Sequence, residues 1–155
     1  MIIKISECLF SPTERCVVRD EMKTELYRVA KKFLSKDQII LTPQKQEAAI
    51  IRKLKSNEYA ILINGQEQAV VRKHFGSKFD VDKVGWHVDC SSYSDRYHTL
   101  LDAQNNQIAE INRTSGANGD YELKITDGMD PFLPIAITVA IDTMSTASKL
   151  VNSHS

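Results

Sequence analysis

Residues 132–144, with the sequence FLPIAITVAIDTM, predict a helix that is apolar on nearly all of its sides. The segment 135–151 has helix-forming composition without Gly or Pro. Asp130 is a candidate N-cap before Pro131, and Pro134 is the alternative first residue, since proline is tolerated in a first turn. A helix of this kind must be enclosed, because apolar side chains left in water cost free energy.

The residues before this helix alternate apolar, β-branched runs with polar turns at nearly regular intervals. The pattern predicts about twelve strands. Asn64-Gly65 is the strongest hairpin signal, since both residues accept the positive φ that tight hairpin turns need. The expected strands are residues 2–10, 15–20, 25–33, 38–42, 47–54, 58–64, 68–75, 78–82, 86–90, 96–101, 107–113 and 121–126.

Together these signals predict a mainly β fold, a closed antiparallel barrel of about twelve strands around a central hydrophobic C-terminal α-helix. Closure also removes exposed strand edges, which otherwise promote aggregation. The length of 155 residues fits one domain. We expect this domain to span residues 1–151, followed by a short polar tail at 152–155.

Two segments of the chain are nearly identical, with AAIIRK at residues 48–53 and QAVVRK at residues 68–73. Looser copies occur at residues 28–32 and 109–113. Repetition at a fixed spacing indicates a repeated structural unit, here the strands of successive hairpins. Basic residues lie at the ends of these expected strands, and they are the best candidates for binding phosphate groups. The candidate anion-binding residues are Lys31, Lys32, Arg52, Lys53, Arg72 and Lys73.

Charge is unevenly placed along the chain. The formal net charge is zero, but residues 23–78 carry a net +7 and residues 79–155 a net −6. Such asymmetry permits a basic surface that attracts a lipid headgroup, a nucleotide or another polyanion. The alternative is that opposite charges pair across neighbouring strands, or that the lysines only keep strand ends soluble.

Asp142 is the second residue of interest, because the helix that carries it is placed inside the barrel. A carboxylate there is costly unless it is paired or hydrogen-bonded. One interpretation is a buried structural polar residue that fixes the depth and rotation of the helix. The other is a functional site within the barrel.

Signals for catalysis, metals and cofactors are weak. The four histidines have no metal-ligand spacing. The three cysteines are odd in number and form no CxxC pair, which favours a reduced cytosolic setting. The six glycines form no nucleotide-phosphate motif, and no aromatic platform favours nucleic acid. We therefore predict no catalytic residue, no metal and no cofactor.

Short motifs along the chain occur in an order that resembles a known family. They are Leu9-Phe10-Ser11, Arg19-Asp20-Glu21, Lys32-Phe33-Leu34-Ser35, Gly85-Trp86-x-Val88, Tyr121-Glu122-Leu123-x-Ile125 and Leu133-x-Ile135-Ala136-Ile137-x-Val139-Ala140-Ile141-Asp142. From about residue 2 to residue 144, the chain resembles a bacterial-type member of the LURP-one-related family. That family shares its fold with tubby C-terminal domains and phospholipid scramblases.

The resemblance implies a closed barrel of about twelve strands threaded by a hydrophobic helix. Tubby-like domains bind phosphoinositides through basic residues on the barrel, and scramblases are linked to calcium and lipid movement. This chain departs from the membrane-anchored relatives because it has no cysteine-rich palmitoylation stretch. That departure argues against lipid scrambling.

We expect a non-enzymatic binding or scaffold module for an anionic ligand, such as a phospholipid headgroup, or for a protein partner. The alternative is a lipid-translocating protein or an enzyme, which requires titratable groups converging in a barrel pocket. We also expect a cytoplasmic monomer with no transmembrane span and no nucleic-acid partner, and with peripheral membrane contact as one option.

Overall fold

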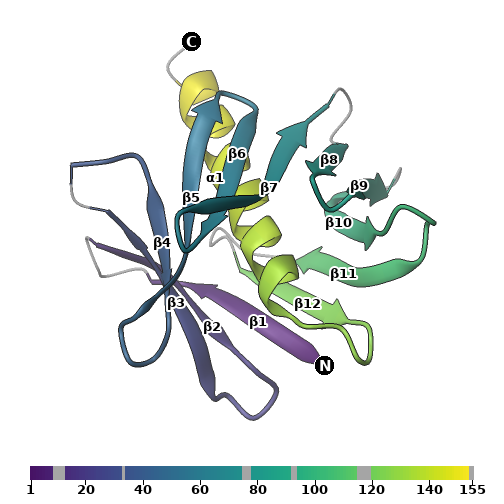
Figure 1. The fold of residues 1–155 in the computed structure, drawn as a ribbon. Helices are drawn as coiled ribbons and strands as arrows, with labels where there is room; N and C mark the ends of the chain where they lie inside the picture. Colours follow the sequence, from purple (N-terminus) through teal and green to yellow (C-terminus); the bar gives the residue numbers. More distant parts are fainter. Residues whose placement is uncertain (9–12, 33, 75–77, 92–93, 115–119, 154–155) are drawn as a thin grey trace.

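The computed structural model describes residues 1–8, 13–32, 34–74, 78–91, 94–114 and 120–153. Within these residues it contains twelve strands followed by one helix (Figure 1). The strands are β1 Ile2–Glu7, β2 Glu14–Arg19, β3 Glu25–Lys31, β4 Gln38–Leu41, β5 Glu47–Lys55, β6 Glu58–Ile63, β7 Gln66–Lys73, β8 Phe79–Asp82, β9 Trp86–Ser91, β10 Ser94–Leu101, β11 Gln107–Arg113 and β12 Tyr121–Ile125. The helix is α1 Phe132–Ser153.

The strands form one closed barrel in which each strand pairs antiparallel with its neighbours in the sequence. β1 and β12 close the ring, where Ile3 pairs with Leu123 and Ile5 with Tyr121. The predicted fold class, a closed antiparallel barrel around a C-terminal helix, is therefore confirmed.

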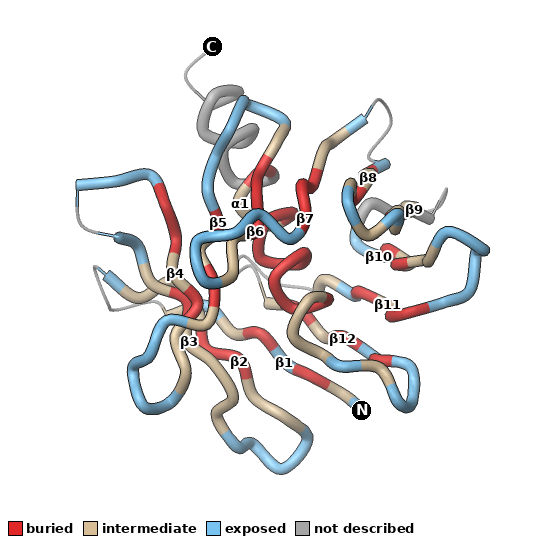
Figure 2. The backbone as a smooth tube through the Cα atoms, viewed as in Figure 1, coloured by how far each residue is buried: buried red, intermediate tan, exposed pale blue. Residues whose placement is uncertain are grey.

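α1 runs through the barrel, and its middle turns are buried among the inward faces of the strands (Figures 1 and 2). Ile135, Ile137 and Ala140 are fully buried although they point in different directions around the helix. They belong to the same core as inward-facing strand residues such as Ile51 and Leu123. The sheet thus covers the apolar circumference of α1 on all sides.

α1 begins earlier than residue 135 because Asp130 caps it. Asp130 Oδ1 accepts a hydrogen bond from Phe132 N at 2.8 Å, and Ile135 N donates to Pro131 O at 3.0 Å. At its other end α1 reaches Ser153, so the helix continues into the segment expected to be a polar tail. No helix among the described residues is both long enough and apolar enough to cross a membrane.

The hairpin turns follow the turn chemistry of the sequence. Asn64 and Gly65 have φ values of 52° and 76° and join β6 directly to β7. In the turn between β2 and β3, Asp20 Oδ1 accepts hydrogen bonds from Met22 N and Thr24 N, each at 2.9 Å. The ends of three expected strands lie outside the described residues, at 9–10, 33 and 75. So do residues 154–155 of the expected polar tail.

The two ends of the barrel carry different parts of the chain. Because neighbouring strands are antiparallel, every odd-numbered strand finishes at the same end. That end also holds Asp142 and Thr143 of α1, since Thr143 Oγ1 lies 2.9 Å from Arg15 Nη1 at the start of β2. The opposite end holds the first turn of α1 and the short turns that follow the even-numbered strands (Figure 1).

We predict that Ile137→Ala lowers the free energy of unfolding by about 2–5 kcal/mol, since it removes a fully buried side chain at the centre of the barrel. Chemical denaturation followed by circular dichroism measures this change. Leu54→Ala, at a side chain 47% exposed, is the control and is expected to shift stability by about 0.5 kcal/mol or less. Equal effects of the two substitutions would contradict the enclosed position of α1.

Candidate functional site

Lysine side chains gather at the end of the barrel where the odd-numbered strands finish. Lys31 ends β3, Lys53 lies near the end of β5, and Lys73 ends β7. Connecting segments add further lysines at the same end. We call this end the basic rim, and its lysines are Lys31, Lys32, Lys36, Lys53, Lys55, Lys73 and Lys78.

Arg52 and Arg72, the two arginines of the predicted anion-binding set, are held in ion pairs with nearby acids. Arg52 Nη2 lies 3.0 Å from Asp37 Oδ2. Arg72 Nε lies 2.5 Å from Glu58 Oε1, and its Nη1 lies 2.6 Å from Asp82 Oδ2. The hydrogen bond from Arg72 lowers the pKa of the Glu58 carboxyl. Each of these guanidinium groups therefore already has a carboxylate partner.

The four lysines of the predicted set differ from the arginines. Lys31, Lys32, Lys53 and Lys73 make no ion pair with any residue that the structure describes. Lys55 has one such contact, 3.7 Å from Glu58, and its side chain is 80% exposed. A long exposed contact of this kind holds the ammonium group only weakly. The basic rim thus presents lysine charge to solvent.

The sequence repeat does not place all its basic pairs in the same orientation. In β5, Ile51 is buried and Arg52 is exposed, so the alternation of side chains places Lys53 on the same face of the strand as Ile51, at the open end of the barrel. In β7, Val71 and Lys73 share a face in the same way. In β3, Val29 is buried and Lys31 shares its direction. The looser copy at 28–32 is therefore out of phase with the two close copies.

The opposite end of the barrel carries acidic residues together with the lysines Lys23, Lys45 and Lys83. Its turns include Asp20 and Glu21 between β2 and β3, and Asp102 after β10. Asp127 and Asp130 lie between β12 and α1. The turns of this end are therefore mixed in charge, whereas the segments at the basic rim are rich in lysine.

Asp142 lies where α1 reaches the basic rim, and both its oxygens have partners. Asp142 Oδ1 accepts a hydrogen bond from the Tyr121 hydroxyl at 2.9 Å, and Oδ2 lies 3.3 Å from Arg15 Nη2. The Asp142 and Arg15 side chains are 23% and 22% exposed. The carboxylate therefore connects α1 to β12 and β2.

The neighbouring residue of α1 extends this contact to a third strand. The Thr143 hydroxyl accepts hydrogen bonds from Arg15 Nη1 at 2.9 Å and from Gln38 Nε2 at 2.7 Å. It donates to Val139 O at 2.8 Å. Arg15 Nη1 also donates to Gln38 Oε1 at 2.8 Å. We call this group the Asp142 cluster, and its members are Arg15, Gln38, Tyr121, Asp142 and Thr143.

Arg15 is a member of the cluster that the sequence pattern did not reveal. Glu14 pairs with Ala30 and Cys16 with Val29, so Arg15 is the extra residue of a β-bulge. Bulges redirect side chains and so break the alternation on which sequence reasoning depends. The inward direction of Arg15 follows from this bulge.

Burial dominates the electrostatics of the cluster. It raises the pKa of the Asp142 carboxyl, while the Tyr121 hydrogen bond and the Arg15 charge oppose this rise. Burial and the nearby Asp142 charge also raise the pKa of the Tyr121 hydroxyl. Because these polar groups already bind one another, the arrangement favours holding α1 in place over acting on a substrate.

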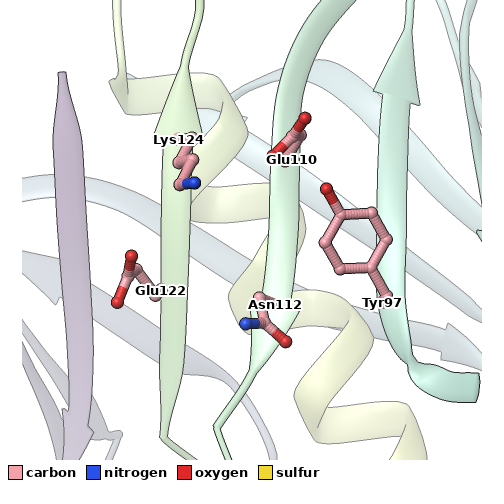
Figure 3. A pocket seen from close by; sticks show the side chains of 5 residues that line it. All are labelled: Tyr97, Glu110, Asn112, Glu122 and Lys124. Atoms are coloured by element: carbon pink, nitrogen blue, oxygen red, sulfur yellow. The ribbon is translucent and has the colours of Figure 1, made fainter.

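A shallow polar pocket lies on the outer wall of the barrel, over β10, β11 and β12 (Figure 3). Its lining residues are Tyr97, Glu110, Asn112, Glu122 and Lys124. A hydrogen bond to Glu110 raises the pKa of Tyr97. The cavity volume of about 100 Å³ is well below the roughly 300–1,000 Å³ typical of small-molecule sites. This pocket is therefore a weaker candidate than the basic rim.

The three cysteines lie just after β1, in β2 and in β9, and none is in a disulfide. Burial raises the pKa of Cys16 to about 12, so its thiol stays protonated at neutral pH. Cys90 of β9 lies opposite His98 of β10. Among the described residues, no set of three or more His, Cys, Asp or Glu side chains is placed to hold a metal ion.

Comparison with known proteins gives a family and a fold. A model of the LURP-one-related family matches residues 1–142. The X-ray structure of a protein from Arabidopsis thaliana is similar, with a TM-score of 0.65 and 14% sequence identity, over 92% of this chain and 91% of that chain. At this identity the likeness supports the fold alone. No curated protein sequence matches the chain.

We predict a pH signature for Asp142. Its raised pKa means that the folded state keeps this proton to higher pH than the unfolded chain does. The contribution of Asp142 to the free energy of unfolding is therefore greatest below about pH 4, and it falls as the pH rises through the pKa of the folded state. Relative to Asp142→Asn, the free energy of unfolding of the parent protein should decline as the pH rises above about 4.

Urea unfolding across a pH series measures this difference. Asp127→Asn is the control, because Asp127 is fully exposed at the opposite end of the barrel. Asp142→Ala, which also removes the acceptor for Tyr121, should cost about 1–3 kcal/mol at neutral pH. A difference between parent and Asp142→Asn that does not vary with pH would show that burial does not dominate at this carboxyl.

Proposed function

The chain belongs to the LURP-one-related family, and on this premise we propose that it is a non-enzymatic binding module whose basic rim holds an anionic ligand. The ligand class is a phosphate-bearing group such as a phospholipid headgroup. The family and the barrel fold fit a binding or scaffold role without specifying a ligand, so the choice of ligand rests on the rim itself.

The exposed lysines of the rim are the observation that carries the proposal. Lys31, Lys32 and Lys53 are exposed and make no ion pair with a described residue, and Lys73 extends the same row at the end of β7. An ammonium group binds phosphate as a compact, mobile point charge and needs no preformed geometry. A row of such groups suits a surface that carries many phosphates.

The charge difference between the two ends supports the same function. Because the basic rim has seven lysines, whereas the turns of the opposite end carry acids beside Lys23, Lys45 and Lys83, the field of the protein orients the basic rim toward a negatively charged surface. Each lysine close to an anionic membrane contributes about 1 kcal/mol, and the attraction falls off within a Debye length. The proposal places the module in the cytoplasm, in peripheral contact with a membrane when it is bound.

The Asp142 cluster has a structural role in this proposal. Its ties to β2, β4 and β12 support a role in fixing the depth and rotation of α1 within the ring. The strand ends that carry the rim lysines then stay at constant positions. Asp142 is thus proposed as an anchor rather than as a ligand-binding residue.

We predict that Lys53→Gln/Lys73→Gln binds anionic vesicles about thirtyfold more weakly at low salt, since two lysines near the surface contribute about 2 kcal/mol. The measurement is cosedimentation with phosphatidylcholine vesicles containing about one quarter phosphatidylserine, repeated at rising salt. The parent protein should lose binding as salt rises, and the variant should bind weakly throughout.

The matched control is Lys23→Gln/Lys45→Gln, which removes the same charge from exposed turns at the opposite end. It should bind like the parent protein. Arg52→Ala/Arg72→Ala is a poorer test, because it removes the guanidinium groups that pair with Asp37, Glu58 and Asp82. Equal binding by the parent and the Lys53→Gln/Lys73→Gln variant would contradict the proposed function.

A further inference from the structure

Leu34 is highly exposed at the basic rim, with 93% of its surface open to solvent. It lies in the turn between β3 and β4 with φ of 58°, a left-handed conformation that bulky residues rarely adopt. Hydrogen bonds close this turn, from Lys32 N to Asp37 O at 3.0 Å and from Ser35 N to Lys32 O at 3.2 Å. The turn thus holds the leucine out in solvent.

Leu54 is the second exposed leucine of the rim, and it too lies at a backbone irregularity. Lys53 pairs with Tyr59 and Lys55 with Glu58, so Leu54 is the extra residue of a β-bulge in β5. A bulge redirects the side chain of the extra residue. The side chain of Leu54 is 47% exposed.

The two leucines belong to neighbouring segments at the same end of the barrel. β4 pairs with β5 at this end, where Gln38 is opposite Ile51. Leu34 comes shortly before Gln38, and Leu54 comes shortly after Ile51. Both side chains therefore lie where the chain extends past the last pairs of these strands.

Lysines flank each leucine in the sequence, with Lys32 and Lys36 around Leu34 and Lys53 and Lys55 on either side of Leu54. We propose that this part of the basic rim docks on an anionic lipid bilayer, with Leu34 and Leu54 inserted below the headgroups and the flanking lysines at the phosphates. The inference rests on the proposed anionic-ligand function. It adds that the phosphates belong to a lipid surface rather than to a free soluble anion.

Two forces of different character act together in this arrangement. The lysines supply an attraction that salt screens, and the leucines supply an apolar contribution that salt does not screen. A soluble polyphosphate gains nothing from leucines, because it has no apolar region to receive them. An interfacial site on a bilayer uses both residue types at the same depth.

Met22 is a highly exposed apolar residue that lies outside the basic rim. It is 86% exposed in the turn between β2 and β3, among Asp20, Glu21 and Lys23 at the opposite end of the barrel. These three residues carry a net negative charge, which an anionic bilayer repels. Met22 is therefore the matched control for Leu34.

The test compares Leu34→Ser/Leu54→Ser with the parent protein on phosphatidylcholine vesicles containing about one quarter phosphatidylserine. We expect binding about tenfold or more weaker for the variant, with the same ratio at every salt concentration at which the parent protein still binds. Binding of inositol hexakisphosphate, measured by calorimetry, should stay unchanged, because this soluble anion meets only the lysines. Met22→Ser should bind vesicles like the parent protein.

The outcomes separate this inference from the proposed function. Vesicle binding that falls in Lys53→Gln/Lys73→Gln but not in Leu34→Ser/Leu54→Ser overturns membrane insertion and leaves anion binding in place. Vesicle binding that falls in neither variant overturns both. A loss in the leucine variant together with weaker binding of inositol hexakisphosphate also overturns insertion, because the substitutions then act on the anion site itself.

A direct reading of depth comes from Leu34→Trp, since Trp86 is the only natural tryptophan and gives a constant background. On anionic vesicles the added emission should shift to the blue and be quenched by brominated lipid chains. Met22→Trp should show neither effect. Unquenched emission from Leu34→Trp on bound protein would place the leucine outside the acyl region and overturn the inference.

Discussion

A helix that is apolar around its whole circumference has to be covered on every side, and the barrel meets that requirement. A flat sheet covers only one face of a helix, whereas a closed ring of strands covers all of them. Thr138 shows how strictly the core excludes free polar groups, because it is fully buried and its hydroxyl donates to Pro134 O at 2.8 Å. Within residues 132–144 of α1 the one charged residue is Asp142, which lies near the rim.

Much of the fold could be predicted from the sequence, since it depends on patterns that are local. Strand periodicity, the Asn64-Gly65 turn and the Asp130 cap each act over a few residues. The partners of Asp142 could not be predicted in the same way. Alternation counted back from buried Val18 directs Arg15 outward, and only the β-bulge turns it toward α1.

The ion pairs of the basic residues in the repeat could not be predicted from the sequence. The pattern grouped Arg52 with Lys53, but the register of β5 against its neighbours separates their roles. A planar guanidinium fits a carboxylate with two hydrogen bonds, and the nearby Asp37 satisfies Arg52 in this way. The ammonium group of a lysine is better hydrated and stays in solvent. Which charges remain open to a ligand was therefore decided by strand neighbours that are distant in the sequence.

The pairing of β1 with β12 has a consequence for the order of events during synthesis. Ile3 can pair with Leu123 only after β12 has been synthesised. The inward faces of the strands are covered only after residues 132–144 have been synthesised. A growing chain that has just left the ribosome therefore has open strand edges and an uncovered apolar surface, both of which favour aggregation. Closure of the barrel therefore comes late, because β1 can pair with β12 only after nearly the whole chain has been synthesised.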